Sequence, residues 1–204
     1  MKITILNGND NASNAAFDAS LQHLEQELAA RGHTVNKLCL RQMDLRYCTG
    51  CFGCWVKTPG ECVTPDDGGR VCQALIESDF LLWASPLSMG FVSSLLKRTM
   101  DKSIPILLPY FETVNNEAHH APRYGRYPLA GLLYEPEEGG DARDEEIMTR
   151  IFSLTALNMK SRLCFSARTS QPAAEIASLI ENAASQKTSL PAPLSATRGT
   201  AVQP

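Results

Sequence analysis

Residues 79–90, DFLLWASPLSMG, decide the fold. After Asp79 the stretch is an apolar run that ends at Ser85-Pro86, and Leu87, Ser88, Met89 and Gly90 follow. A strand covered on both faces has such a continuous apolar run, whereas a strand with one wet face alternates apolar and polar residues. The stretch therefore predicts a central strand in a parallel sheet with helices on both sides.

Strands and helices alternate on either side of this stretch. Further strands are predicted at residues 2–6, 34–40, 129–134 and 162–167, from short apolar or β-branched runs. Helices are predicted at about residues 15–31, 67–77, 92–102 and 144–158 and from Pro172 onward. In the first helix the apolar face is Phe17, Leu21, Leu24 and Leu28, and in the fourth it is Ile147, Met148, Ile151 and Phe152. Residues 103–128 show no clear period and receive no assignment.

Five strands joined by helices predict a three-layer α/β domain, because right-handed crossovers place helices on both faces of a parallel sheet. Five parallel strands suit the flavodoxin-like order 2-1-3-4-5. In this arrangement a ligand lies beyond the carboxyl ends of the strands, beside the loops after strands 1 and 3. We expect one domain over residues 1–186 and a flexible tail over residues 187–204, which are rich in Pro, Ser, Thr and Ala.

Composition narrows the range of functions. The chain has 204 residues, 44% hydrophobic and 20% charged, with a formal net charge of −3. It lacks the basic surface that a nucleic-acid partner requires, and no run approaches the ~18 apolar residues of a membrane span. The apolar run at the N-terminus is too short for a signal peptide. We therefore expect a cytoplasmic protein with neither nucleic-acid nor membrane partners.

The loop after the first strand, residues 7–14 (NGNDNASN), leads directly into a helix. The first N–H groups of a helix are unpaired and can hold a phosphate, and Ser13 and Asn14 add side-chain donors. The same residues are also common in a turn that caps a helix and binds nothing. The loop after the central strand, residues 85–90, carries few charges and a glycine, which suits a planar ring. A tight turn with Met89 packed into the core is equally compatible with these residues.

Four cysteines form a C-x2-C-x2-C-x7-C pattern at Cys48, Cys51, Cys54 and Cys62. Iron–sulfur clusters prefer four thiolate ligands, and this spacing can supply them. Structural zinc more often uses two C-x2-C pairs with a long spacer, so zinc fits less well. A catalytic dithiol, or a cysteine-rich loop without metal, is also compatible with the pattern. Cys39, Cys72 and Cys164 are interpreted as core residues.

Two further groups are interpreted without a binding role. His119 and His120 show no ligand spacing with the thiols and are predicted to form a solvated loop pair. The acidic residues between 135 and 146 are interpreted as an exposed turn and the start of a helix, since Asp and Glu favour the first helical turn.

The cysteine pattern, Asp66-Asp67 and the stretch DFLLWASPLSMGFVSSLLKRTMDK together resemble the NADPH-dependent FMN reductase family, and more narrowly iron–sulfur flavoproteins and their cluster-free relatives. The resemblance covers about residues 1–134. It implies FMN, with the phosphate on Asn9, Asn11, Ser13 and Asn14, and the ring and ribityl chain on Pro86, Leu87, Ser88, Met89 and Gly90. Relatives often carry G-S-P-R where this chain has Gly8-Asn9-Asp10-Asn11, so the bidentate phosphate contact of that arginine is absent.

The resemblance implies an NAD(P)H-dependent flavin oxidoreductase that passes electrons through FMN to a small-molecule or protein acceptor. A 4Fe–4S cluster on Cys48, Cys51, Cys54 and Cys62 would connect two-electron flavin chemistry to a one-electron acceptor. No catalytic side-chain acid or base is required, because the cofactor carries the chemistry. A homo-oligomer is also expected by resemblance. The alternatives are a non-enzymatic electron carrier and a binding module that has lost its cofactor.

Overall fold

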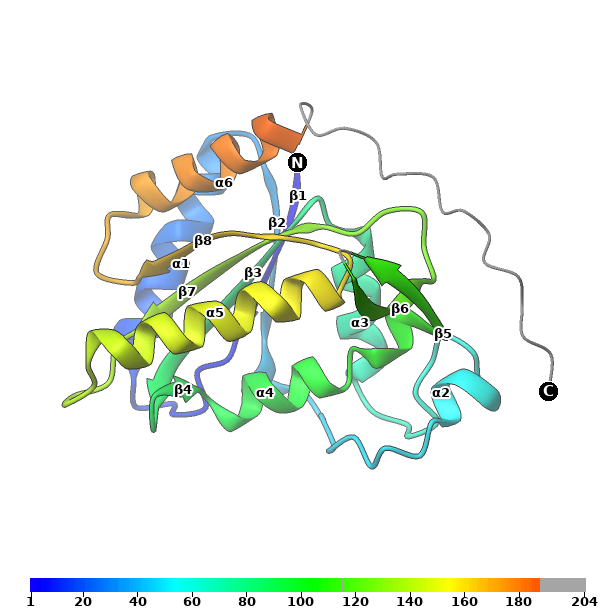
Figure 1. Ribbon diagram of the computed structural model, residues 1–204. Helices are drawn as coiled ribbons and strands as arrows, with labels where there is room; N and C mark the ends of the chain where they lie inside the picture. The colour runs from blue at the N-terminus through cyan, green and yellow to red at the C-terminus, as the bar shows by residue number, and fades with distance from the viewer. Residues whose placement is uncertain (115, 188–204) are drawn as a thin grey trace.

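The computed structural model describes residues 1–114 and 116–187 and contains the predicted parallel sheet (Figure 1). Its order is β2-β1-β3-β7-β8, which confirms the order 2-1-3-4-5 for the five parallel strands. Central strand β3 pairs with β1 on one side and β7 on the other. The strands are β1 (Lys2–Asn7), β2 (Thr34–Cys39), β3 (Phe80–Ser88), β7 (Leu129–Glu135) and β8 (Leu163–Arg168).

Helices cover both faces of the sheet (Figure 1). One layer is α1 (Ala15–Ala30) and α6 (Ala173–Lys187), and the other is α3 (Gly68–Glu77), α4 (Ser94–Asp101) and α5 (Ala142–Asn158). The predicted apolar face of α1 is fully buried in the first layer. In the second layer, Trp83 of β3 meets Phe152 of α5 edge to face, with ring centroids 5.2 Å apart. The side chains of β3 therefore enter both cores, as its unbroken apolar run predicts.

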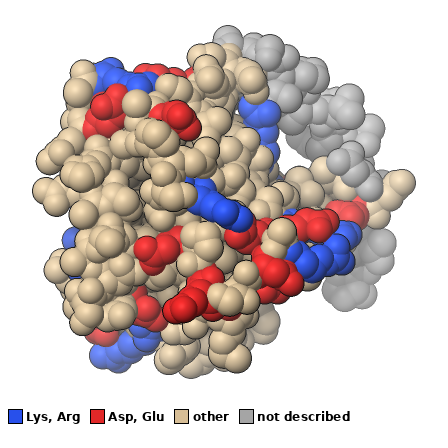
Figure 2. Space-filling model, turned by 90° about the vertical axis from the view of Figure 1, so that its left-hand side faces the viewer, with Lys and Arg blue, Asp and Glu red and all other residues tan. Residues whose placement is uncertain are grey.

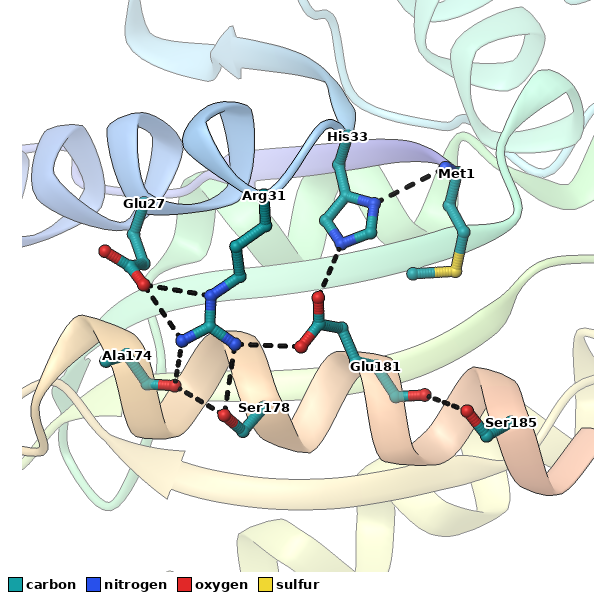
Figure 3. A network of polar contacts seen from close by, with 8 residues as sticks. All are labelled: Met1, Glu27, Arg31, His33, Ala174, Ser178, Glu181 and Ser185. Carbon is teal, nitrogen blue, oxygen red and sulfur yellow. Dashed lines mark hydrogen bonds and ion pairs between the residues drawn. The ribbon is translucent and has the colours of Figure 1, made fainter.

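A polar network joins the end of α1 to the side of α6 that faces it (Figure 3). Arg31 donates to Glu181 at 2.8 Å, to Ser178 at 3.1 Å and to the Ala174 carbonyl at 3.0 Å. The other Glu181 oxygen lies 3.0 Å from His33 Nε2. Glu181 thus joins α6 both to the end of α1 and to the start of β2.

Two predicted helices differ in detail. The helix expected at 92–102 begins at Ser94, because Phe91–Val92 forms a short strand, β4, antiparallel to the end of β3. In α5, Met148 and Phe152 are fully buried, whereas Ile147 and Ile151 are 44% and 40% exposed. The buried stripe of α5 is therefore narrower than the predicted one, which placed all four side chains on the core face.

The unassigned segment 103–128 contains a turn of 3-10 helix, η2 (Ile104–Ile106), and a hairpin of β5 (Leu107–Val114) and β6 (Glu117–Pro122). The prediction that His119 and His120 form a solvated loop pair is wrong. His119 is 7% exposed and its Nδ1 lies 2.9 Å from Asn158 Oδ1, and the His120 ring contacts Trp55 and Phe111. The hairpin folds back over α2 (Gly53–Val56) and the end of α5, which covers both imidazoles.

The predicted tail, residues 187–204, lies outside the described residues except for Lys187, the last residue of α6. Among the helices that the structure describes, none has the length and hydropathy needed to span a bilayer. A further short helix, η1 (Leu40–Gln42), leads from β2 toward the cysteine loop.

Candidate functional site

The loops after β1 and β3 meet at the carboxyl edge of the sheet. The Gly8 N–H donates to the Ala84 carbonyl at 2.7 Å, and the Ser93 hydroxyl donates to the Gly8 carbonyl at 2.5 Å. The Ser93 N–H in turn donates to Ser85 Oγ at 2.9 Å. A Cβ on Gly8 would lie 2.7 Å from Leu96 Cβ, so only glycine permits this close approach. The loop after β1 therefore contacts β3 and the N-cap of α4 directly, and Ser93 links it to Ser85 of the second predicted loop.

A series of asparagine side chains shapes the loop after β1. The Oδ1 atoms of Asn7, Asn9 and Asn11 accept the N–H groups of Asn9, Asn11 and Ser13, two residues further on in each case. Asn14 caps α1 by accepting the Phe17 N–H at 3.1 Å. Three backbone donors of the loop are thus already paired within it, as Asx turns allow. Among the four residues predicted to hold phosphate, Asn9 is fully buried, whereas Asn11 and Ser13 are exposed.

Arg41 approaches the same loop but is held by a carboxylate. Its guanidinium contacts Asp18 at 2.7 and 3.2 Å and the Asn9 carbonyl at 3.3 Å. Burial alone would raise the pKa of Asp18, but hydrogen bonds from Arg41 and Asn7 outweigh it and lower that pKa. The positive charge of Arg41 is therefore largely balanced by Asp18.

The predicted loop at residues 85–90 lies mostly within the strand, because β3 continues to Ser88 and pairs with β4, which leaves Met89 and Gly90 as the turn between them. Leu87 is buried, Pro86 is half-buried, and Ser88 is exposed. Met89 is 94% exposed and has a φ of 54°, so it does not pack into the core as the tight-turn alternative required. A non-glycine residue with positive φ is strained, and such strain often occurs at ligand sites.

Carboxylates from the end of β7 and from the loop after it border both predicted binding segments. Glu135 Oε2 accepts from Asn14 Nδ2 at 2.6 Å, and Glu137 Oε1 accepts the Gly90 N–H at 3.0 Å. Figure 2, which views the end toward which β7 and β8 point, shows acidic side chains spread across it. A cavity of only about 10 Å³ lies between Gly90 and the acidic loop. Two of the expected turn carboxylates therefore contact the predicted flavin loops, which disfavours a phosphate there electrostatically.

The four thiols lie elsewhere, around a cavity of about 300 Å³. Cys48 and Cys51 are exposed, Cys62 is half-buried and Cys54 is buried at the first turn of α2. The Gly53 N–H and the Thr49 hydroxyl lower the pKa of Cys51, whereas burial raises the pKa of Cys54. Within the described residues, no three His, Cys, Asp or Glu side chains lie close enough together to hold a single metal ion.

The other three cysteines lie outside this cavity. Cys72 is buried, its Sγ lies 3.6 Å from the Lys102 carbonyl, and burial raises its pKa to about 12. Cys39 and Cys164 are half-buried in β2 and β8. Cys72 is therefore a core thiol, and the pattern of four cysteines corresponds to one spatial group.

Helix α4 runs between the two candidate sites (Figure 1). Its N-cap, Ser93, touches the loops at the carboxyl edge, and its last residue, Asp101, and the adjacent Lys102 line the thiol cavity. The sequence interpretation missed Lys102 and gave Glu135 and Glu137 no binding role. The position of the two glutamates directly after the fourth predicted strand could have indicated them, since that strand also ends at the carboxyl edge.

Comparisons with known proteins identify relatives of this chain by sequence and by fold. The sequence profile of the NADPH-dependent FMN reductase family matches residues 1–121. Two iron–sulfur flavoproteins of Archaeoglobus fulgidus are 36% identical over 126 residues and 28% identical over 103 residues, which are 60% and 50% of this chain. These matches span only about half the length of each relative, 50% and 49%.

Solved structures share the fold at low sequence identity. An FMN-dependent NADH-azoreductase from Bacillus anthracis, solved in complex with FMN, superposes with a TM-score of 0.58 and 15% identity. The superposition covers 91% of this chain and 98% of the azoreductase. At this level of identity the likeness extends to the fold alone.

Proposed function

The chain belongs to the NADPH-dependent FMN reductase family, and from this premise we propose that it is an FMN-dependent oxidoreductase. It takes electrons from NADPH or NADH and passes them through FMN to an acceptor, by way of an iron–sulfur cluster on Cys48, Cys51, Cys54 and Cys62. The main structural support is the contact of the loop after β1 with β3 and with the N-cap of α4 at the carboxyl edge, where doubly wound sheets bind their ligands.

The residues of the two predicted binding loops would have different roles in holding FMN. Asn11, Ser13 and Asn14 would hold the phosphate, and residues 86–90 would hold the ring system and the ribityl chain. Asn9 is buried, and its side chain bonds Asn14 O and the Asn11 N–H, so it would shape the loop rather than touch the phosphate. Glu135 and Glu137 oppose phosphate binding, so we expect weaker FMN binding than a basic loop would give.

When bound, the flavin supplies hydride acceptance and the release of electrons singly or in pairs. The chain's own residues then have three tasks: to hold the phosphate, to orient the ring, and to leave one face of the ring accessible to the nicotinamide. Met89 and Ser88 are exposed, so a nicotinamide can reach this part of the site from solvent. No proton transfer by a side chain is needed for hydride transfer to the ring.

The thiol cavity fits a cluster better than it fits a single ion. Four thiols line a space of about 300 Å³, and no three of them converge on one point. A multi-atom cluster separates its four thiolate ligands further than one ion does. The buried ammonium of Lys102 also borders the cavity, and a positive charge suits an assembly of thiolates.

An anaerobic titration tests the proposed reaction. The purified protein is mixed with FMN, freed of unbound flavin, and titrated with NADPH or NADH while the flavin absorbance is followed. Bleaching by either nicotinamide supports the oxidoreductase. Bound flavin that neither nicotinamide reduces would instead identify an electron carrier, and a protein that binds no FMN refutes the proposal. The acceptor, the cytoplasmic location and the homo-oligomer stay predictions.

Iron and sulfide analysis after anaerobic reconstitution tests the cluster. We expect Cys54→Ser to lose most of the bound iron, whereas Cys39→Ser, a matched change outside the cavity, keeps it. Equal iron content in both variants would contradict the assignment of the four ligands.

A further inference from the structure

A buried ion pair forms one wall of the thiol cavity. Lys102 Nζ lies 2.6 Å from Asp66 Oδ2, and the two side chains are 2% and 0% exposed. The same ammonium lies 3.5 Å from Cys62 Sγ. Burying two charges costs several kcal/mol per ion before their attraction is counted, so replacing such a pair with apolar residues is often neutral or stabilising. A contribution to stability therefore does not by itself account for this pair.

The surroundings of Asp66 hold the pair in one position. Asp66 accepts the N–H groups of Arg46 and Gly68, both at 2.9 Å, in addition to the ammonium. A Cβ on Gly68 would lie 2.6 Å from Lys102 Cε, so the lysine stem occupies the space that only a glycine leaves free. Residues 66–68 thus hold the ammonium beside Cys62, and the N–H of Arg46 holds Asp66 in turn.

We propose that Lys102 is a positioning residue for the cluster: its ammonium, aimed by Asp66, donates to the Cys62 thiolate and places one fixed positive charge beside the cluster. This inference depends on the cluster of the proposed function. Reduction adds one electron to an assembly that is already negative, and a nearby cation stabilises the reduced form more than the oxidised form. Lys102 therefore raises the midpoint potential of the cluster. The carboxylate of Asp66, on the other side of the ammonium, lowers this potential.

Two substitutions break the same ion pair but change the charge in opposite directions. Lys102→Gln removes a positive charge and should lower the midpoint potential of the reconstituted holoprotein. Asp66→Asn removes a negative charge and should raise it. We expect each substitution to change the equilibrium between oxidised and reduced cluster about tenfold, which is 59 mV for a one-electron couple. A purely structural role would move both potentials in the same direction, because both variants lose the same pair.

The measurement is an anaerobic redox titration of the cluster, followed by absorbance and electron paramagnetic resonance. Lys37→Gln is the matched control, since Lys37 of β2 pairs with Glu25 of α1 and neither residue lines the thiol cavity. It should leave the potential unchanged, and Lys102→Arg, which keeps the charge, should stay close to wild type.

If Lys102→Gln alone does not fold, the double variant Asp66→Asn/Lys102→Gln replaces it, because it leaves no charge unpaired. Its potential must then lie below that of Asp66→Asn alone. Shifts of the same sign, or no shift beyond that of Lys37→Gln, overturn the role of Lys102 while leaving the cluster intact. A wild-type protein that takes up no iron and sulfide overturns the cluster first, so the two failures are distinguishable.

Discussion

Glu135→Gln should strengthen FMN binding. Glu135 Oε2 accepts from Asn14 Nδ2 at 2.6 Å, so its charge lies one amide away from a residue proposed to hold the phosphate. Two hydrogen bonds that meet at the amide separate carboxylate and phosphate by about 6 Å. At that distance a pair of unit charges repels by roughly 0.7 kcal/mol in water and 2.8 kcal/mol at an effective dielectric constant of ~20. A value between these limits, about 1.4 kcal/mol, corresponds to a tenfold lower Kd.

Titration of FMN and of riboflavin, followed by flavin fluorescence, measures this effect. Glutamine has the same size and keeps an acceptor for Asn14, so the change isolates charge. Riboflavin lacks the phosphate, and its Kd should stay constant. The gain for FMN should shrink as salt is raised, because exposed charges are screened. Glu146→Gln, an exposed change on α5, is the control. An equal change for both flavins, or no gain for FMN, would refute a phosphate site beside Asn14.

Three further predictions concern the scaffold. Gly8→Ala should destabilise the fold by about 1–3 kcal/mol, because the new Cβ meets packed atoms. Gly69→Ala, with open space around its Cβ, should be neutral or stabilising. Urea unfolding measures the free energy of unfolding of both variants. Ser93→Ala removes the α4 cap and the bond to the loop after β1, and should cost about 0.5–2 kcal/mol in the same assay and weaken flavin binding. Hydrogen bonds from His33 and Arg31 lower the pKa of Glu181 (Figure 3). The stability that the Glu181 charge contributes is therefore present above about pH 4.5 and is lost as the pH falls through the folded pKa. The unfolding free energies of wild type and Glu181→Gln should converge in acid, which urea unfolding at several pH values measures.

Local patterns were sufficient to predict the sheet and most helices. The unbroken apolar run of β3 indicated burial on both faces, and the spacing of Phe17, Leu21, Leu24 and Leu28 indicated one buried helix face. The alternation of strands and helices then left few possible topologies. The hairpin of β5 and β6 could not be assigned in this way, because its burial pattern is irregular and its packing against α2 depends on contacts distant in sequence.

The candidate sites were predictable only in part, for a similar reason. Loop position follows from topology, so the two flavin loops could be paired before any coordinates were known. The partners of those loops come from elsewhere in the chain: Arg41 follows β2, Glu135 ends β7 and Lys102 follows α4. Whether a charged side chain points toward a loop depends on packing that no local pattern encodes.

Helix α4 connects the two candidate sites. The helix has 8 residues, which corresponds to a length of about 12 Å. Its amino end is fixed to the flavin loops through Ser93, and its carboxyl end continues into the Lys102–Asp66 pair beside the thiols. Leu95, Leu96 and Thr99 bury one side of the helix, which holds it against the core between these two ends. Helix α4 therefore connects the loop proposed to bind FMN with the cavity proposed to hold the cluster, and its length of about 12 Å indicates the scale of their separation.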